Sequence, residues 1–268
     1  MNNSLEKEYL EHKVFEQLKE YSMFYESLSF SIMNWITTGT SSLINIDTYM
    51  YSSMKGTLES ISDILYKGRI NDSYSLLRKF YDLVVINIYT NLYLDENIGI
   101  DNFINNKINN WVKGKEKIPS FGIMSEYIIK SEKVKKITRL IYEDGNFKGS
   151  NFEELRKRCN DHTHYLYYHN ILSNDNEIHS NNRILTLDEF SNDLKDIFIL
   201  HFSYLFYIKE NYMMSSDYLD YLDCGLEPED DSQYWVAPFI QNIFDTVIKT
   251  NRPDISKIIL ENISMKLE

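Results

Sequence analysis

Proline and glycine are scarce in this chain, and their scarcity limits the folds open to it more than any other feature. The 268 residues contain four prolines and nine glycines. A fold of many short strands needs these residues at its turns, whereas long helices exclude them from their interiors. No segment alternates apolar and polar residues over the length of a strand. The sequence therefore predicts an all-α protein.

Apolar residues recur at helical spacing along most of the chain, as Leu10, Val14 and Leu18 do near its start. Asp47 and Gly68 are placed to cap the two ends of a second helix. The predicted helices cover residues 4–36, 46–67, 71–94, 126–142, 152–172 and 185–213, with two more inside 235–268. We expect seven to nine helices in a single domain spanning residues 1–268.

Several classes of protein do not fit the composition. Two cysteines, Cys159 and Cys224, make no disulfide framework. The N-terminal stretch is charged and lacks the apolar core of a signal peptide. The longest apolar run, LVVINIY from Leu83, is far shorter than the roughly 20 residues that span a bilayer. We expect a soluble, cytoplasmic protein with no membrane partner.

Charge is unevenly distributed along the chain. The formal net charge of −12 argues against a general nucleic-acid binder. Residues 107–139 nevertheless hold nine Lys or Arg against three Glu, while residues 210–231 hold eight acidic residues and no basic one. The simplest interpretation is a solvated helix surface and an acidic loop. The functional alternative is a local RNA-binding face, with Lys133, Lys135, Lys136 and Arg156 as candidate contacts.

The stretch RKRCNDHTHY, residues 156–165, is the densest group of chemically active side chains. Three of the six histidines, His162, His164 and His169, lie within eight positions. Histidine suits general acid–base chemistry because its unperturbed pKa lies near neutrality. Arginine suits phosphate because its planar fork binds two oxygens at once. Together they are the residue types that metal-free RNA cleavage requires.

This stretch resembles the R-x4–6-H motif of HEPN-domain proteins, an all-α group from bacterial toxin and phage-defence systems. Five residues separate Arg158 from His164, and five separate Arg156 from His162. The segment GRINDSYSLLRKFYD, residues 68–82, is similar to a helix–helix segment of HEPN-like proteins. The resemblance covers about residues 48–212 and leaves 213–268 as a C-terminal helical extension. It implies RNA as substrate, no cofactor and no metal, and a homodimer that pools two motifs in one cleft.

The resemblance also implies roles for single residues. Arg158 would stabilise the phosphate and His164 would be the main acid–base, with His162, Asn160 and Asp161 in support. On a helix Arg158 and His162 share a face, whereas Arg158 and His164 are about 120° apart and would converge only through the long Arg side chain or across a dimer.

Structural interpretations of the same residues stay open at this point. Arg158 could pair with Glu154 or Asp161 on its own helix. His162 and His169 could line a polar seam beneath the tyrosines. Outside the motif, Arg78 lies in an apolar helix, where we expect it to pair with Asp82 or Glu59.

A zinc site is a less favoured alternative. Cys159, His162 and His169 lie at i, i+3 and i+10, so distant groups would have to complete the ligand set. Cys224 has acidic neighbours, which oppose its use as a nucleophile.

Two functions therefore follow from the sequence. The leading one is a HEPN-like, metal-independent endoribonuclease, the effector or toxin of a defence system with an antitoxin or other defence partner. The alternative is a non-catalytic scaffold, interaction or sensor protein on the same fold. The position of the motif side chains discriminates them: an open cleft favours the enzyme, and internal salt bridges favour the scaffold.

Overall fold

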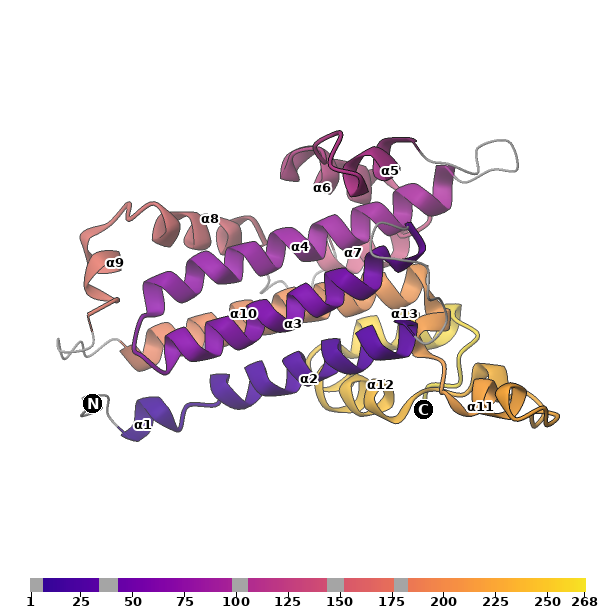
Figure 1. Ribbon diagram of the computed structural model, residues 1–268. Coiled ribbons are helices and arrows are strands. Elements are labelled where there is room, and N and C mark those ends of the chain that lie inside the picture. The colour runs from indigo at the N-terminus through magenta and orange to yellow at the C-terminus, as the bar shows by residue number, and fades with distance from the viewer. Residues whose placement is uncertain (1–6, 34–42, 98–105, 144–151, 176–182) are drawn as a thin grey trace. The chain divides into compact units, whose positions relative to one another are not determined.

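A computed structural model describes residues 7–33, 43–97, 106–143, 152–175 and 183–268 (Figure 1). Within these ranges every regular element is a helix, and one isolated β-bridge joins Met214 to Val236. The all-α prediction is confirmed, but the described residues form more helices than the seven to nine expected. None of the described helices is both long enough and apolar enough to cross a membrane.

The contacts between residues divide the chain into two units. Unit 1 comprises Met1–Glu26, Met50–Val84 and Lys148–Phe198; unit 2 comprises Ser27–Tyr49, Val85–Phe147 and Ile199–Glu268. Four helices contribute residues to both units, and they are α2 (Val14–Met33), α3 (Ile46–Leu65), α4 (Ile70–Asn97) and α10 (Arg183–Ile208).

Unit 1 has an aromatic core, as its many tyrosines and phenylalanines allow. Tyr21 and Phe198 stack with ring centroids 3.9 Å apart, and Tyr25 meets Phe80 edge to face at 5.9 Å. All four side chains are buried. Besides parts of the four long helices, the unit contains α1 (Lys7–Leu10), α8 (Phe152–Thr163) and α9 (Tyr168–Leu172).

The predicted helix over residues 4–36 is wrong in one respect, because the chain breaks between α1 and α2. His12 explains the break. Its Nδ1 accepts a hydrogen bond from the backbone N–H of Val14 at 3.2 Å, which satisfies a donor at the start of α2. Its Nε2 lies 3.3 Å from Asp188 Oδ1. The end of α3 follows the prediction, with Gly68 at φ 75° and its N–H bonded to Leu65 O.

Besides parts of the four long helices, unit 2 contains several short helices. They are α5 (Asn106–Val112), α6 (Phe121–Lys130), α7 (Lys135–Tyr142), α11 (Asp217–Asp223), α12 (Pro238–Ile243) and α13 (Pro253–Asn262). The predicted single helix over 126–142 is wrong, since Ser131 ends α6 in an extended conformation. The Ser131 hydroxyl donates a hydrogen bond to Glu96 Oε1 at 2.6 Å. This bond between residues distant in the sequence stabilises the break between α6 and α7.

A buried polar network lies within the largely apolar interior of unit 2. The Asp47 carboxylate accepts hydrogen bonds from Asn87 Nδ2 at 2.6 Å, Asn91 Nδ2 at 3.0 Å and the Tyr212 hydroxyl at 2.8 Å. Since Asn87 uses its Nδ2 here, its Oδ1 is left to accept from His201 Nε2 at 2.8 Å. Burial lowers the pKa of His201 to about 3, so its ring is neutral. Asp47 therefore joins separate segments of the unit instead of serving as a simple helix cap.

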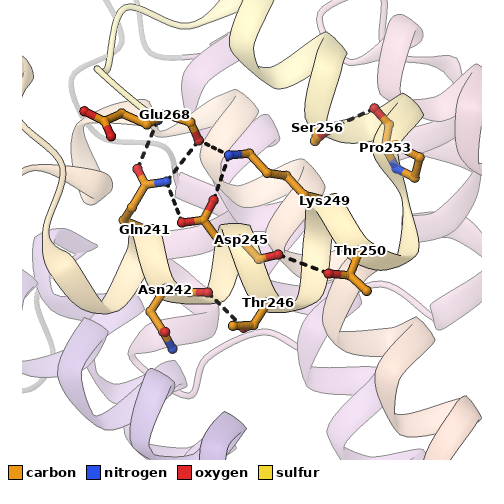
Figure 2. Close-up of polar contacts among 9 residues, drawn as sticks. All are labelled: Gln241, Asn242, Asp245, Thr246, Lys249, Thr250, Pro253, Ser256 and Glu268. Carbon is orange, nitrogen blue, oxygen red and sulfur yellow. Dashed lines mark hydrogen bonds and ion pairs between the residues drawn. The ribbon is translucent and has the colours of Figure 1, made fainter.

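Side chains from α12 and from the π-helix η5 (Phe244–Lys249) form hydrogen bonds with one another and with Glu268 at the end of unit 2 (Figure 2). Gln241 Nε2 donates to Asp245 Oδ2 and to the backbone oxygen of Glu268, both at 3.1 Å. Lys249 bonds to Asp245 Oδ1 at 2.7 Å and also donates to Glu268 O. The hydrogen bond from Lys249 lowers the pKa of Asp245. The predicted turn near Pro253 follows, and α13 completes the chain's helices.

Candidate functional site

Helix α8 carries the motif and is anchored by one apolar face. Phe152, Leu155, Cys159 and His162 are all buried and recur at the spacing of one helix side. The Phe152 ring lies 6.2 Å from that of Tyr81 in α4. Burial raises the pKa of the Cys159 thiol, so Cys159 is a core residue with no nucleophilic character.

Arg158 is held by two carboxylates of α10. Its Nε donates to Asp193 Oδ2 at 3.0 Å, and its Nη2 donates to the other oxygen of the same carboxylate. Glu189, one turn earlier, lies 3.4 Å from Nε. Asp193 is 5% exposed while Arg158 is 31% exposed. The hydrogen bonds to Asp193 raise the pKa of Arg158, so its fork is charged and already occupied.

Arg156, two residues earlier in α8, is also paired with a carboxylate of another helix. Its Nη1 bonds to Asp82 Oδ1 at 2.5 Å, and the other Asp82 oxygen lies 3.7 Å from Arg78 Nε. The predicted pairing of Arg78 with Asp82 is confirmed. Asp82 thus joins α4 to α8, and both arginines of the motif are engaged in interhelical ion pairs inside unit 1.

His162 lies in the interior of unit 1, on the buried face of α8. Its ring stacks on Tyr74 with centroids 4.0 Å apart, and its Nδ1 lies 2.9 Å from Asn71 Oδ1. Because Oδ1 is an acceptor only, Nδ1 carries the proton. Burial, reinforced by nearby His169, lowers the pKa of His162 to about 4. His162 therefore lies in a polar seam against a tyrosine, as the structural interpretation expected, but His169 is exposed and does not line that seam.

The predicted single helix over 152–172 is wrong, because α8 ends at Thr163. The backbone N–H groups of Tyr165 and Leu166 bond to His162 O and Asp161 O, the pattern of a Schellman motif. Tyr165 adopts φ 50° at the position that glycine ordinarily fills. A side chain in this left-handed conformation costs roughly 1 kcal/mol. The chain then turns back into α9.

Helix α9 and the residues after it dock on the first turn of α4. The backbone N–H of Ile70 donates to Ser173 O at 3.1 Å. The Asn174 side chain both accepts from the Asp72 N–H at 3.1 Å and donates to Asp72 Oδ1 at 2.7 Å. Asn170 Nδ2 reaches back to Asp161 O at 2.8 Å. Asn174 is therefore a capping residue for α4, supplied from about a hundred positions along the chain.

Four polar atoms near the junction of α4, α8 and α9 are buried with no hydrogen-bond partner in the structure. They are Asn71 Nδ2, the Tyr74 hydroxyl, Asn160 Oδ1 and Asn170 Oδ1. Each such atom costs about 1–3 kcal/mol relative to a bonded one. The junction of α4, α8 and α9 is consequently less stable than it would be with these four atoms hydrogen-bonded.

The turn between α8 and α9, together with α9 itself, exposes a group of large apolar side chains, which we call the aromatic segment. It consists of Tyr165 (47% exposed), Leu166 (60%), Tyr167 (51%), Tyr168 (73%) and Ile171 (49%). No Asp, Glu, Lys or Arg occurs from residue 162 to 174. Helical periodicity missed this surface because it treats apolar residues as buried; the uncharged run HYLYYHNIL was the available signal.

The remaining predicted site residues are scattered. His164 is exposed at the end of α8, and Asp161 uses its carbonyl to hold Asn170. Three of the predicted RNA contacts lie in unit 2, in α7 or just before it, and each donates a hydrogen bond to another side chain. These bonds join Lys133 to Asp95 at 2.5 Å, Lys135 to Glu132 at 2.8 Å and Lys136 to Asn262 at 2.6 Å. Cys159 and His162 are buried and His169 is exposed; over the described ranges no three His, Cys, Asp or Glu residues cluster to hold a metal.

Comparison with protein-family models, with curated proteins and with solved structures gave no match. The geometry of α8, α9 and their partners therefore carries the functional argument.

Proposed function

We propose that this protein is a non-catalytic helical interaction protein that binds a second copy of itself through the aromatic segment. The observation that carries the proposal is the exposure of five large apolar side chains within seven uncharged residues. Scattered apolar residues on a surface need no explanation, but a contiguous group of them is typical of a binding site.

The state of the motif favours binding over chemistry. A phosphate would have to displace Asp193 from Arg158 and leave a carboxylate that is only 5% exposed without its partner. His162 is neutral, buried and stacked, so it cannot reach a substrate in this conformation. These residues support the surface from below, because they fix α8 immediately before the turn.

The chemistry of the aromatic segment favours a protein partner. Protein interfaces are enriched in tyrosine and depleted of charged residues at their centre. Nucleic-acid surfaces need cations for the phosphates, and this run has no Lys or Arg. For a chain of net charge −12, two copies meet with least repulsion at an uncharged surface.

Sedimentation velocity over a range of concentrations tests the proposal. We expect wild-type protein to form a dimer at tens of micromolar, and Leu166→Ser/Tyr168→Ser to remain monomeric because it removes two of the most exposed side chains. Leu185→Ser is the matched control, since Leu185 is 66% exposed in α10 outside the segment. A wild-type protein that stays monomeric, or a control that dissociates equally, contradicts the proposal.

A metal-independent endoribonuclease is the second candidate, because His164 is exposed and adjoins aromatic side chains on which bases could stack. In that case the HEPN resemblance would extend to activity, with an RNA substrate and a defence-system or antitoxin partner. A dimer through the aromatic segment would also bring two copies of His164 together, so dimerisation alone does not separate the candidates. Cleavage of RNA does, because only the second candidate predicts it.

A further inference from the structure

The residues from Asp217 to Asp231 form a second exposed surface, in unit 2, which we call the acidic segment. It contains seven Asp or Glu residues, and no Lys or Arg occurs between Lys209 and Lys249. Within the described residues one ion pair involves it, between Asp231 and Lys266 at 3.4 Å. Most of its negative charge is therefore available to a partner.

Apolar side chains are exposed among these acids. Helix α11 buries none of its residues. Leu222 is 48% exposed and lies between Asp220 and Asp223 in the sequence; Leu226 is 58% exposed and directly precedes Glu227. Tyr218 and Tyr221 are half-buried beside them. An apolar centre with a charged rim is the arrangement of a protein-binding surface, and a simple solvated loop does not require it.

The two ends of the acidic segment are tied together. The backbone N–H of Ser215 donates to Trp235 O at 2.7 Å, and that of Ala237 donates to Met213 O at 2.8 Å. These bonds flank the Met214–Val236 bridge. In Figure 1 the orange α11 lies clear of α12. A projection with a fixed base presents its side chains with less entropy to lose on binding.

We propose that the acidic segment is a docking surface for a basic amphipathic segment of another protein. Its leucines would pack against the apolar side of the partner, while Lys or Arg residues of the partner would pair with Asp220, Asp223 and Glu227. Nucleic acid is excluded as the occupant by charge repulsion. The inference is independent of dimerisation through the aromatic segment, which belongs to unit 1.

A labelled synthetic amphipathic peptide of lysine and leucine is the probe, and fluorescence anisotropy with the full chain is the measurement. We expect binding that weakens with salt, and no binding of a glutamate–leucine peptide of the same pattern. Asp220→Lys/Asp223→Lys should weaken binding about tenfold or more through lost charge. Leu222→Ser/Leu226→Ser should do so about equally through lost apolar contact.

Asp63→Lys/Glu153→Lys is the matched control, because both acids are exposed in unit 1 and the change in net charge is the same. It should bind the peptide as wild type does, and so should the dimer variant Leu166→Ser/Tyr168→Ser. Thermal melts establish that each variant is folded, with Leu222→Ala/Leu226→Ala as the milder replacement. The inference is overturned if the wild-type protein does not bind the peptide, or if the leucine variant binds it as tightly as wild type does. It is also overturned if the control loses as much affinity as the α11 variants.

Discussion

Arg158 shows how a side chain suited to phosphate can serve the fold. Its bidentate contact with Asp193 compensates a carboxylate that burial has removed from water. Burial alone raises the pKa of Asp193, and Arg158 opposes that shift. Removing one member of such a pair leaves a buried charge, whereas removing both does not.

Arg158→Ala should lower the free energy of unfolding by about 2 kcal/mol or more, because Asp193 is left without its cation. Adding Asp193→Leu should recover part of that loss. Urea denaturation measures both, with Lys157→Ala as control, an exposed neighbour that should change stability by less than about 0.5 kcal/mol. An Arg158→Ala protein as stable as the control would show that the ion pair is dispensable.

His162 should make stability depend on pH. Its pKa falls from 6.5 in the unfolded chain to about 4 in the fold, so between these values the unfolded state binds more protons. The stability contributed by the neutral ring is thus present above pH 6.5 and is lost as pH falls toward 4, by about 3 kcal/mol.

His162→Gln should flatten this slope in urea titrations between pH 7 and pH 4, although it is less stable than wild type at pH 7. His164→Gln, at an exposed position two residues further on, is the matched control for loss of a histidine. His201 titrates in the same direction and remains in both variants, so the difference between them isolates His162. Identical slopes would place the titrating group elsewhere.

At the scale of elements, the turn from α8 into α9 combines strain with exposure. Tyr165 occupies a left-handed position that glycine would fill at lower cost, yet its side chain is 47% exposed and belongs to the aromatic segment. Strained backbone is often kept where a side chain has a functional role.

Tyr165→Gly should therefore stabilise the monomer by roughly 1 kcal/mol and weaken the dimer, because it relieves the strain and removes an exposed ring. Thermal unfolding and sedimentation velocity read the two effects separately. Tyr167→Gly is the control, because it removes an aromatic ring two residues later and leaves the strained backbone of Tyr165, at φ 50°, unchanged. A less stable Tyr165→Gly protein would mean that the tyrosine ring contributes more than the strain costs.

Helical periodicity predicted where the helices lie and which of them carries the motif. It did not predict the residues that end the helices or the carboxylates that pair with the motif's arginines. Helix positions follow from local apolar spacing, so α3 and α4 lie close to their predicted ranges. The breaks depend on distant partners, such as Asp188 for His12 and Glu96 for Ser131. The partners of Arg156 and Arg158 are 74 and 35 positions away, beyond any local pattern.

At the scale of the whole molecule, each unit combines buried polar contacts with an exposed surface for which we propose a binding role. Unit 1 has the ion pairs and seam of α8 beneath the aromatic segment, and unit 2 has the Asp47 network together with the acidic segment. Both interiors place neutral histidines against asparagine amides, through His162 with Asn71 and His201 with Asn87. Directional bonds of this kind favour one arrangement of a helical core over its alternatives.

The most direct test is to incubate the protein with labelled single-stranded RNA in EDTA. It asks whether the motif serves the fold and the interface or instead cleaves RNA. We predict no cleavage above the buffer blank for wild type, because Arg158 is occupied by Asp193 and His162 is buried. Fragments ending in 2′,3′-cyclic phosphate would contradict this prediction if His164→Ala abolished them while leaving the free energy of unfolding unchanged.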